Sequence, residues 1–317
     1  MSAPFYLGID IGGTKTAVSL LREGDGVIAK ERFATHAEEG PERGMGRILD
    51  AAGKVAPSGT RLEGVGISVG AMFDPVTGCF GAAPHMPAWE GFPIVGAVAK
   101  AFSLPVAADN DANACALAEW RYGAGKGTRH LAFLTFGTGL GAGLILDGRV
   151  YRGKSALAGE IGATRVAEDG PPVRGKPGCL EGYASGAGIA GLVERRLASF
   201  SGTTCLKPGG TAFDVAEGAR AGDALCLSIL RESGDYLGRG LAILMDLLNL
   251  EIIVIGSIFV RCEDLLRPSM EAAILRDAMP TTRADCRVVP AALGEEIGDY
   301  AAMALASSGL WCSIGGE

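Results

Sequence analysis

One stretch decides the fold: Leu7-Gly-Ile-Asp10-Ile-Gly12-Gly13-Thr14-Lys15-Thr16. Apolar runs lie on both sides of it, and this pattern predicts two β-strands joined by a tight turn at Gly12-Gly13. Because glycine has no Cβ, backbone N–H groups of such a turn can approach a phosphate. Thr14 and Lys15 add a hydroxyl and a positive charge. Taken alone, the stretch predicts either a phosphate-binding turn or a plain hairpin.

A second glycine turn favours the phosphate-binding interpretation. It lies in Phe136-Gly137-Thr138-Gly139-Leu-Gly141-Ala-Gly143 and follows a predicted strand at 131–136. Two such turns could hold one nucleotide across a cleft between two lobes. Asp10, at the end of the first strand, could then hold a hydrated Mg²⁺ that bridges the nucleotide phosphates.

The rest of the chain predicts an α/β protein in two lobes. Strands are expected at 5–10, 16–21, 26–30, 64–69, 105–108, 131–136, 142–146, 149–151, 251–256 and 286–289. Helices are expected near 45–52 and at 93–102, 112–122, 186–200, 213–218, 222–248, 263–275 and 297–307, with a loop at 163–178. We place the small lobe at 1–117 plus 296–317 and the large lobe at 118–295.

Composition narrows the function classes. The chain has 317 residues, of which 48% are hydrophobic and 21% charged, a balance typical of globular proteins. Its net charge of −7 is spread over both signs and argues against nucleic acid as a partner. No signal peptide or membrane helix is apparent, and the eight cysteines have no CxxC spacing. A soluble cytoplasmic protein with reduced thiols is expected.

A cluster of acids and amides, Asp109-Asn110-Asp111-Ala112-Asn113, lies where a strand ends and a helix begins. Asp and Asn are favoured helix caps, so capping alone could explain it. Only one of the two acids, Asp109 or Asp111, is needed as the cap, however. The other acid could accept the proton of a substrate hydroxyl as it attacks a γ-phosphate, and the positive helix end would keep it ionised.

These motifs, in this order, resemble those of the ROK sugar kinases, within the actin-like ATPase and hexokinase fold. The glycine turns resemble the two phosphate motifs of the family, and 109–113 resembles its Glu-Asn-Asp-Ala-Asn catalytic motif. Three further segments match the two halves of the family signature and its Pro-Asn-Leu segment: Ala158-Gly-Glu160-Ile-Gly162, Gly178-Cys-Leu-Glu181 and Ala83-Pro-His-Met-Pro-Ala-Trp89.

The resemblance implies a two-lobed actin-like ATPase (ribonuclease H-like) fold with a central cleft. It also implies a kinase that transfers the γ-phosphoryl group of MgATP to a hydroxyl of a hexose, aminosugar or related polyol. Asp111 would be the general base, with Mg²⁺ held through Asp10 and the ATP phosphates. Substrate contacts are expected at Gly70, His85, Asn110, Glu160 and Glu181, and ATP contacts at Gly12, Gly13, Thr14, Lys15, Thr138, Gly139 and Gly256. A homodimer is expected.

Several positions depart from the family pattern. Ala163 stands where the family usually has His, and Pro172-Val173-Arg174-Gly175 stands where it has Cys-x-Cys-Gly. Of the four zinc ligands only Cys179 remains, and one thiolate cannot build a tetrahedral site. We therefore expect no structural zinc and expect other contacts to hold the loop at 163–178. Ala163 and His85, where the family tends to have Asn, leave specificity for ordinary glucose open.

Two other functions stay open at this point. The altered signature, together with Gly256-Ser257-Ile258 in place of a Gly-Gly pair, would suit a sugar-binding protein without turnover. The retained Asp10, Asp111 and Glu160 favour the kinase. Some ROK proteins are transcriptional repressors with a helix-turn-helix before the first strand, whereas here that strand is expected at residue 5.

Overall fold

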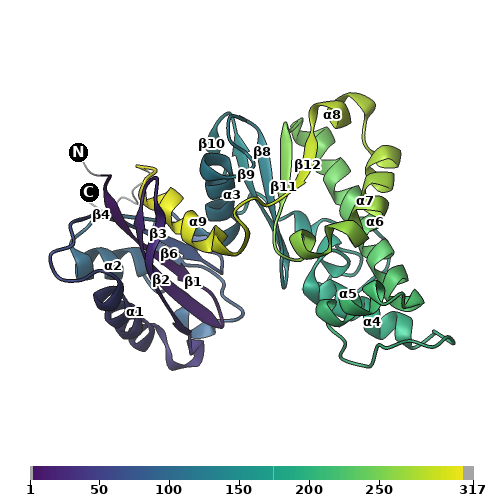
Figure 1. Ribbon diagram of the computed structural model, residues 1–317, viewed down its shortest axis with the longest axis horizontal. Coiled ribbons are helices and arrows are strands. Elements are labelled where there is room, and N and C mark those ends of the chain that lie inside the picture. Colours follow the sequence, from purple (N-terminus) through teal and green to yellow (C-terminus); the bar gives the residue numbers. More distant parts are fainter. Residues whose placement is uncertain (1–2, 174, 310–317) are drawn as a thin grey trace. The chain divides into compact units, whose positions relative to one another are not determined.

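The computed structural model describes residues 3–173 and 175–309, and every structural statement below concerns these residues (Figure 1). Arg174, Cys312 and the chain ends used in the sequence arguments lie outside them. The chain divides into two compact units, which are described separately. Unit 1 comprises Met1–Gly123, Arg152–Ala158 and Glu295–Glu317, and unit 2 comprises Ala124–Tyr151 and Gly159–Gly294. The lobe boundaries given above stay a prediction.

Unit 1 contains a five-stranded sheet in the order β3-β2-β1-β4-β7. Its strands are β1 (Phe5–Ile11), β2 (Lys15–Arg22), β3 (Gly26–Ala34), β4 (Leu62–Val69) and β7 (Val106–Asn110). The first three form an antiparallel meander, and β1, β4 and β7 run parallel. The parallel strands end together, because Ile11 pairs with Val69 and Val69 pairs with Asn110. The segments that follow them therefore leave the same edge of the sheet.

Helices cover both faces of this sheet. α1 (Pro41–Val55) and α2 (Ile94–Phe102) pack into the main apolar core on one face. α3 (Asp111–Tyr122) and α9 (Ile297–Ala306) pack together on the other. α9 lies so close to β4 that a Cβ on Gly66 would be 1.9 Å from the Ala302 carbonyl oxygen. The short elements are η1 (Ala37–Glu39), β5 (Phe73–Asp74), β6 (Cys79–Phe80) and η2 (Pro87–Trp89).

Unit 2 repeats the arrangement of a hairpin followed by parallel strands. Its sheet has the order β10-β9-β8-β11-β12, with β8 and β9 antiparallel and β8, β11 and β12 parallel. The strands are β8 (Leu131–Phe136), β9 (Leu140–Leu146), β10 (Arg149–Val150), β11 (Ile252–Ile255) and β12 (Arg287–Pro290). Leu134 of β8 pairs with Ile255 of β11, so the segments after these strands also leave one edge.

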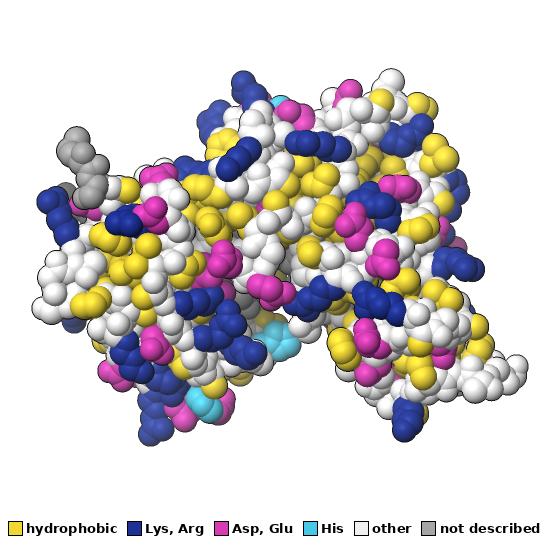
Figure 2. Space-filling view, viewed as in Figure 1, with side chains coloured by type: hydrophobic (Ala, Val, Ile, Leu, Met, Phe, Trp, Pro, Cys, Tyr) yellow, Lys and Arg dark blue, Asp and Glu magenta, His cyan; other side chains and the backbone are white. Residues whose placement is uncertain are grey.

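Unit 2 is rich in helices. They are η3 (Ile161–Ala163), η4 (Leu180–Gly182), α4 (Gly186–Leu197), α5 (Ala212–Arg220), α6 (Ala224–Leu248), α7 (Ile258–Asp277) and α8 (Pro280–Asp285), and η5 (Gly294–Glu296) follows. α6 and α7 pack closely, since a Cβ on Gly238 would lie 2.3 Å from the Met270 carbonyl oxygen. None of the helices in the described residues is both long and apolar enough to cross a membrane. Figure 2 shows charges of both signs interspersed over the visible surface.

The expected strands and helices are present, with three corrections. The helix expected at 263–275 begins at Ile258 and continues through a kink at Cys262. Its first turn was missed because only two residues separate the apolar residues there from the apolar strand β11. α8 was missed: it has six residues and none of them is buried, so it has no apolar period to detect. The small β5–β6 hairpin was missed because each strand has only two residues.

Candidate active site

The catalytic turn predicted at 109–111 lies at the junction of β7 and α3. Asn110 is the helix cap, and its Oδ1 accepts a hydrogen bond of 2.8 Å from the Asn113 N–H. Asp111 is the first residue of α3 and is exposed. Its Oδ1 accepts a bond of 2.9 Å from the Ala112 N–H. Asn110 supplies the cap, in place of either of the two acids expected there, so capping does not require the Asp111 carboxylate.

A buried ion pair stabilises this turn. Asp109, which is 1% exposed, accepts hydrogen bonds from the Asn110 N–H at 2.8 Å and from Asn113 Nδ2 at 2.9 Å. Two nitrogens of Arg152 contact a single oxygen of this carboxylate, Oδ2, with Nε at 2.8 Å and Nη2 at 2.7 Å. Four donors on one buried carboxylate hold the turn firmly.

Sequence reasoning missed Arg152. It comes from Arg152–Ala158, which belongs to unit 1 although the sequence on either side of it belongs to unit 2. Arg152 is 43 positions from Asp109, and no local pattern links them. The available signal was indirect: a buried aspartate needs a cationic partner, but nothing in the chain says which cation supplies it.

The three parallel strand ends bring the predicted unit 1 residues to one edge. Gly70, after β4, donates a bond of 2.8 Å to the Ile11 carbonyl, and a Cβ on Gly70 would lie 3.3 Å from the Gly12 Cα. The Gly12 N–H closes its own turn by a 3.0 Å bond to the Lys15 carbonyl. The N–H groups of Gly13 and the exposed Thr14 make no backbone hydrogen bond within the described part of the chain.

His85 lies beside the first glycine turn. A Cβ on Gly13 would be 2.9 Å from the His85 Cβ. The segment that carries His85 is held by Met86 and Trp89, which are 0% and 1% exposed, and the Trp89 ring packs edge-on against Phe80 at 5.3 Å. His85 itself is exposed.

Asp10, at the end of β1, has a perturbed acidity. Its pKa is raised, chiefly by burial and also by the nearby Asp299, while a hydrogen bond from Ser68 opposes the shift. A Cβ on Gly298 of α9 would lie 2.6 Å from the Asp10 Oδ2, so any larger residue at position 298 would clash with this carboxylate. A nearby cation stabilises the charged form of a desolvated carboxylate, and carboxylate oxygens are ligands that Mg²⁺ prefers. The residues present therefore fit the expected ion.

In unit 2, Glu181 contacts the second glycine turn. Its Oε2 accepts a bond of 2.8 Å from the Leu140 N–H, and a Cβ on Gly139 would lie 2.9 Å from the same oxygen. The N–H groups of Gly186 and Ala187, at the start of α4, donate to the carbonyls of Gly137 and Thr138 at 2.8 and 3.1 Å. The second turn is thus held by η4 and α4.

Gly256 and Ser257 follow β11 and lie near the same turn. The Gly256 N–H donates to the Leu134 carbonyl at 3.0 Å, and a Cβ on Gly256 would be 2.9 Å from the Phe133 ring. A Cβ on Gly137 would lie 3.6 Å from the Ser257 Oγ. Ser257 has φ 56° and ψ −113°, a conformation that favours glycine. Serine thus occupies a strained backbone position here.

Protein contacts hold the loop at 163–178. The Ala163 carbonyl accepts from Lys176 Nζ at 2.9 Å and from Cys179 Sγ at 3.5 Å. Leu180 N–H donates to the Thr164 carbonyl at 2.9 Å, and Tyr183 donates its hydroxyl proton to the Asp169 carbonyl. Glu160, exposed, precedes η3 at the start of this loop. The absence of zinc stays a prediction.

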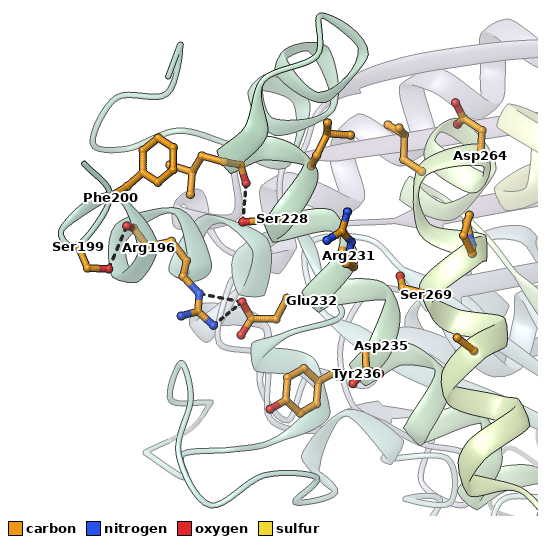
Figure 3. A pocket seen from close by; sticks show the side chains of 15 residues that line it. Arg196, Ser199, Phe200, Ser228, Arg231, Glu232, Asp235, Tyr236, Asp264 and Ser269 are labelled. Carbon is orange, nitrogen blue, oxygen red and sulfur yellow. Dashed lines mark hydrogen bonds and ion pairs between the residues drawn. The ribbon is translucent and has the colours of Figure 1, made fainter. Parts of the chain in front are cut away.

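A groove lies elsewhere in unit 2. It has a volume of about 1030 Å³ and is lined by residues of α4, α6 and α7 (Figure 3). Two of its charged side chains, Arg196 and Glu232, pair with each other at 2.7 Å, and Asp235 pairs with Arg239 and Arg276 outside the lining. None of the predicted site residues lines it.

Comparison with known proteins finds relatives over most of the chain. The sequence profile described as the ROK family matches residues 6–308. A glucokinase of Halalkalibacterium halodurans is 33% identical over 309 residues, covering 94% of this chain and 93% of that protein. The structure of a ROK family glucokinase from Streptomyces griseus, in complex with glucose and AMPPNP, superposes with a TM-score of 0.79 at 30% identity, covering 96% of this chain and all of that one.

A regulator has the same fold. The structure of a ROK family transcriptional regulator, a homologue of the E. coli MLC protein, superposes with a TM-score of 0.88 at 25% identity and covers 98% of this chain and 80% of that one. The two units thus have the α/β architecture of the actin-like ROK kinases. With the family profile spanning nearly all of the sequence, the chain belongs to the ROK family.

Proposed function

We propose that the chain is an ATP-dependent sugar kinase, which transfers the γ-phosphoryl group of MgATP to a hydroxyl of a hexose, aminosugar or related polyol. Family membership and the glucokinase relatives support the reaction class. The observation that carries the proposal in this chain is the placement of Asp111. It is an exposed carboxylate on a firmly held turn, at the sheet edge that also carries the Gly12-Gly13 turn.

Asp111 acts as the general base. It accepts the proton of the sugar hydroxyl while that oxygen forms a bond to the γ-phosphorus and the bond from phosphorus to the ADP oxygen breaks. Asn110 assists by binding the sugar. Because its Oδ1 accepts the capping bond, its amide nitrogen is the end that donates to a sugar hydroxyl.

The glycine turns bind the phosphates. In the first turn this task falls to the N–H groups of Gly13 and Thr14 and to the Lys15 side chain, since the Gly12 N–H closes the turn. Thr138, Gly139 and Gly256 would serve the nucleotide from unit 2. Asp10 would hold Mg²⁺, which supplies positive charge for the phosphates when bound.

The remaining substrate contacts are assigned to Gly70, His85, Glu160 and Glu181. His85 lies against the first glycine turn, and Ala163 leaves out a side chain that the family usually has there. By the family resemblance, the His that Ala163 replaces reaches the hydroxyls near the anomeric carbon, so both changes favour an acceptor other than ordinary glucose. We also propose that the protein is a cytoplasmic homodimer that binds no nucleic acid and carries no structural zinc.

A coupled assay of ADP release tests the proposal. The purified chain is mixed with MgATP and a panel of hexoses, N-acetylaminosugars, heptoses and cyclitols, with glucose as the first member. We expect sugar-dependent ADP release with at least one class. Sugar binding by calorimetry without any ADP release would instead support the non-catalytic alternative.

The likeness to a regulator defines a second test. An electrophoretic mobility assay on random genomic fragments, with and without the sugar panel, should show no shift. A sugar-dependent shift in the absence of ADP release would favour the regulator.

A further inference from the structure

A pair of cysteines lies in unit 2, apart from the residues assigned to catalysis. The Cys205 and Cys226 sulfurs are 3.9 Å apart. Cys205 is exposed, in the segment before α5, and Cys226 is buried in the first turn of α6. The two sulfurs are thus close to van der Waals contact, and one of them is open to solvent.

Asp223 holds the two backbones in this arrangement. It is the cap of α6, and its Oδ1 accepts from the N–H groups of Leu225 at 2.9 Å and Cys226 at 3.1 Å. Its Oδ2 accepts from the Cys205 N–H at 2.7 Å. One carboxylate therefore ties the segment of Cys205 to the start of the helix that carries Cys226.

Gly218 of α5 leaves the space that the sulfurs occupy. A Cβ at this position would lie 2.4 Å from the Cys226 sulfur and 2.6 Å from the Cys205 sulfur. The loop, α5 and α6 thus converge on the pair.

Metal binding and disulfide formation are the two chemistries open to this cluster. The Cys205, Asp223 and Cys226 ligand atoms lie within 4.8 Å of one another. Both oxygens of Asp223, however, already accept hydrogen bonds, including one of 3.1 Å from the Thr204 hydroxyl to Oδ1. The N-terminus of α6 also presents positive potential, which disfavours a cation. A disulfide needs neither the carboxylate nor an ion.

We propose that Cys205 and Cys226 form an intrachain disulfide when the protein meets a small-molecule disulfide such as oxidised glutathione. The Cys205 thiolate attacks one sulfur of the reagent, forms a mixed disulfide and releases the first glutathione thiolate. The Cys226 sulfur then attacks the Cys205 sulfur and displaces the second glutathione thiolate. The two protein protons pass to these leaving groups, so two protein thiols are oxidised and one glutathione disulfide is reduced to two thiols.

The exposures explain the order of the two steps. Cys205 reacts first because it is accessible. Burial raises the pKa of Cys226 to about 12, so its thiol is a poor first nucleophile and reacts only with the mixed disulfide beside it.

Peptide mapping tests the proposal directly. Trypsin should release 197–220, since the Lys207-Pro208 bond resists cleavage, and 221–231, each with one cysteine. The full chain is incubated with oxidised glutathione, alkylated, digested and analysed by mass spectrometry. We expect these two peptides joined by a disulfide, lost on reduction, and a rise in the melting temperature of roughly 5 °C.

Variants complete the test. Cys226→Ser should stop the reaction at Cys205 and leave a stable glutathione adduct there. Cys79→Ser, a control at a partly exposed cysteine in unit 1, should leave the cross-link unchanged. The proposal is overturned if the wild type keeps both thiols, holds only the mixed disulfide, or cross-links between chains. Tight binding of Zn²⁺ by the reduced wild type, lost in Cys226→Ser, would overturn it in favour of a metal site.

Discussion

Gly12-Gly13 in unit 1 and Gly137–Gly139 in unit 2 are both glycine turns between antiparallel strands, and they are held in different ways. The first is held within its own meander: Gly12 N–H donates to Lys15, and the Thr35 hydroxyl donates to the Gly12 carbonyl at 2.6 Å. The second is held from outside, by Glu181, which is 41 positions from the residue it binds. Both turns have a local bond, since the Gly137 N–H donates to the Gly139 carbonyl at 3.1 Å, and the second turn has in addition a charged acceptor from a distant segment.

The largest expected effect comes from Asp111, which would place the chemistry in unit 1. Asp111→Asn should lower kcat by about 10²–10⁴-fold, because the amide cannot accept the hydroxyl proton. Sugar binding, measured by calorimetry, should change little. Asp50→Asn, at an exposed aspartate on α1, is the matched control and should be fully active. Wild-type kcat in Asp111→Asn would refute the assignment.

The next largest effect is expected for Asp10→Asn, which should change both kcat and the pH dependence of stability. Its folded-state pKa is raised, so at neutral pH the charged carboxylate reduces stability, and this cost disappears as pH falls below the usual pKa of aspartate. Asp10→Asn should therefore resist urea better than the wild type at pH 7, and the difference should vanish at low pH. In the proposed role of Asp10 as a Mg²⁺ ligand, its loss should lower kcat about 100-fold or more.

The wild-type pH profile provides a second check on Asp10. Activity should be lost on acidification at a higher pH than an ordinary aspartate would give, because Asp10 must be charged to hold Mg²⁺. Raising the Mg²⁺ concentration should move this loss to lower pH. An acidic limb of the pH profile that does not shift with Mg²⁺ concentration would contradict the role of Asp10.

Variants at position 152 test whether the ion pair of Arg152 with Asp109 positions the turn at 109–111. Arg152→Met leaves the buried Asp109 charge without its cation and should cost about 3–5 kcal/mol of unfolding free energy, measured in urea. The double variant Asp109→Asn with Arg152→Met removes that charge and should recover much of the stability. Its kcat should stay reduced about 10-fold, with KM for sugar less affected, because the turn is no longer positioned.

An exposed arginine controls for the loss of positive charge. Arg149→Met in β10 should alter neither stability nor kcat. Full activity in the double variant Asp109→Asn with Arg152→Met would show that the ion pair does not position the turn at 109–111.

Variants at position 181 test whether the hydrogen bond from the Leu140 N–H to Glu181 stabilises the second glycine turn. Glu181→Ala should raise KM for ATP about 10-fold, because the Leu140 N–H loses a charged acceptor. KM for sugar should rise by a similar factor if the other carboxylate oxygen binds a sugar hydroxyl. Glu181→Gln can still accept from Leu140 and should restore most of the ATP affinity. An unchanged KM for ATP in the alanine variant would show that this brace is dispensable.

The smallest effect concerns Ser257, beside the second turn. Ser257→Gly should increase the unfolding free energy by about 1 kcal/mol, because relief of the strained φ outweighs the extra freedom of glycine in the unfolded chain. Thermal unfolding measures the gain, with Ser199→Gly, where φ carries no such strain, as the control. A lower unfolding free energy in Ser257→Gly would mean that the Ser257 side chain stabilises the fold by more than its strained backbone destabilises it.

Much of the site could be predicted because its residues follow strands. Asp10, Gly70 and Asp111 each come directly after or at the end of a parallel strand, and parallel strands of one sheet end at one edge. The partners of these residues could not be predicted in the same way. Gly298 lies against Asp10 only because α9, from the far end of the chain, packs on this sheet.

The sequence by itself determined the two glycine hairpins, the alternation of strands and helices, and the acid at the start of α3, since turn preference and apolar period act over a few residues. Only the tertiary structure decided that Arg152 neutralises Asp109, that Glu181 braces the second turn, and that Cys205 meets Cys226. Buried charges, orphan N–H groups and thiols take partners from whichever segment packs beside them. That choice depends on the packing of the whole unit rather than on neighbouring residues.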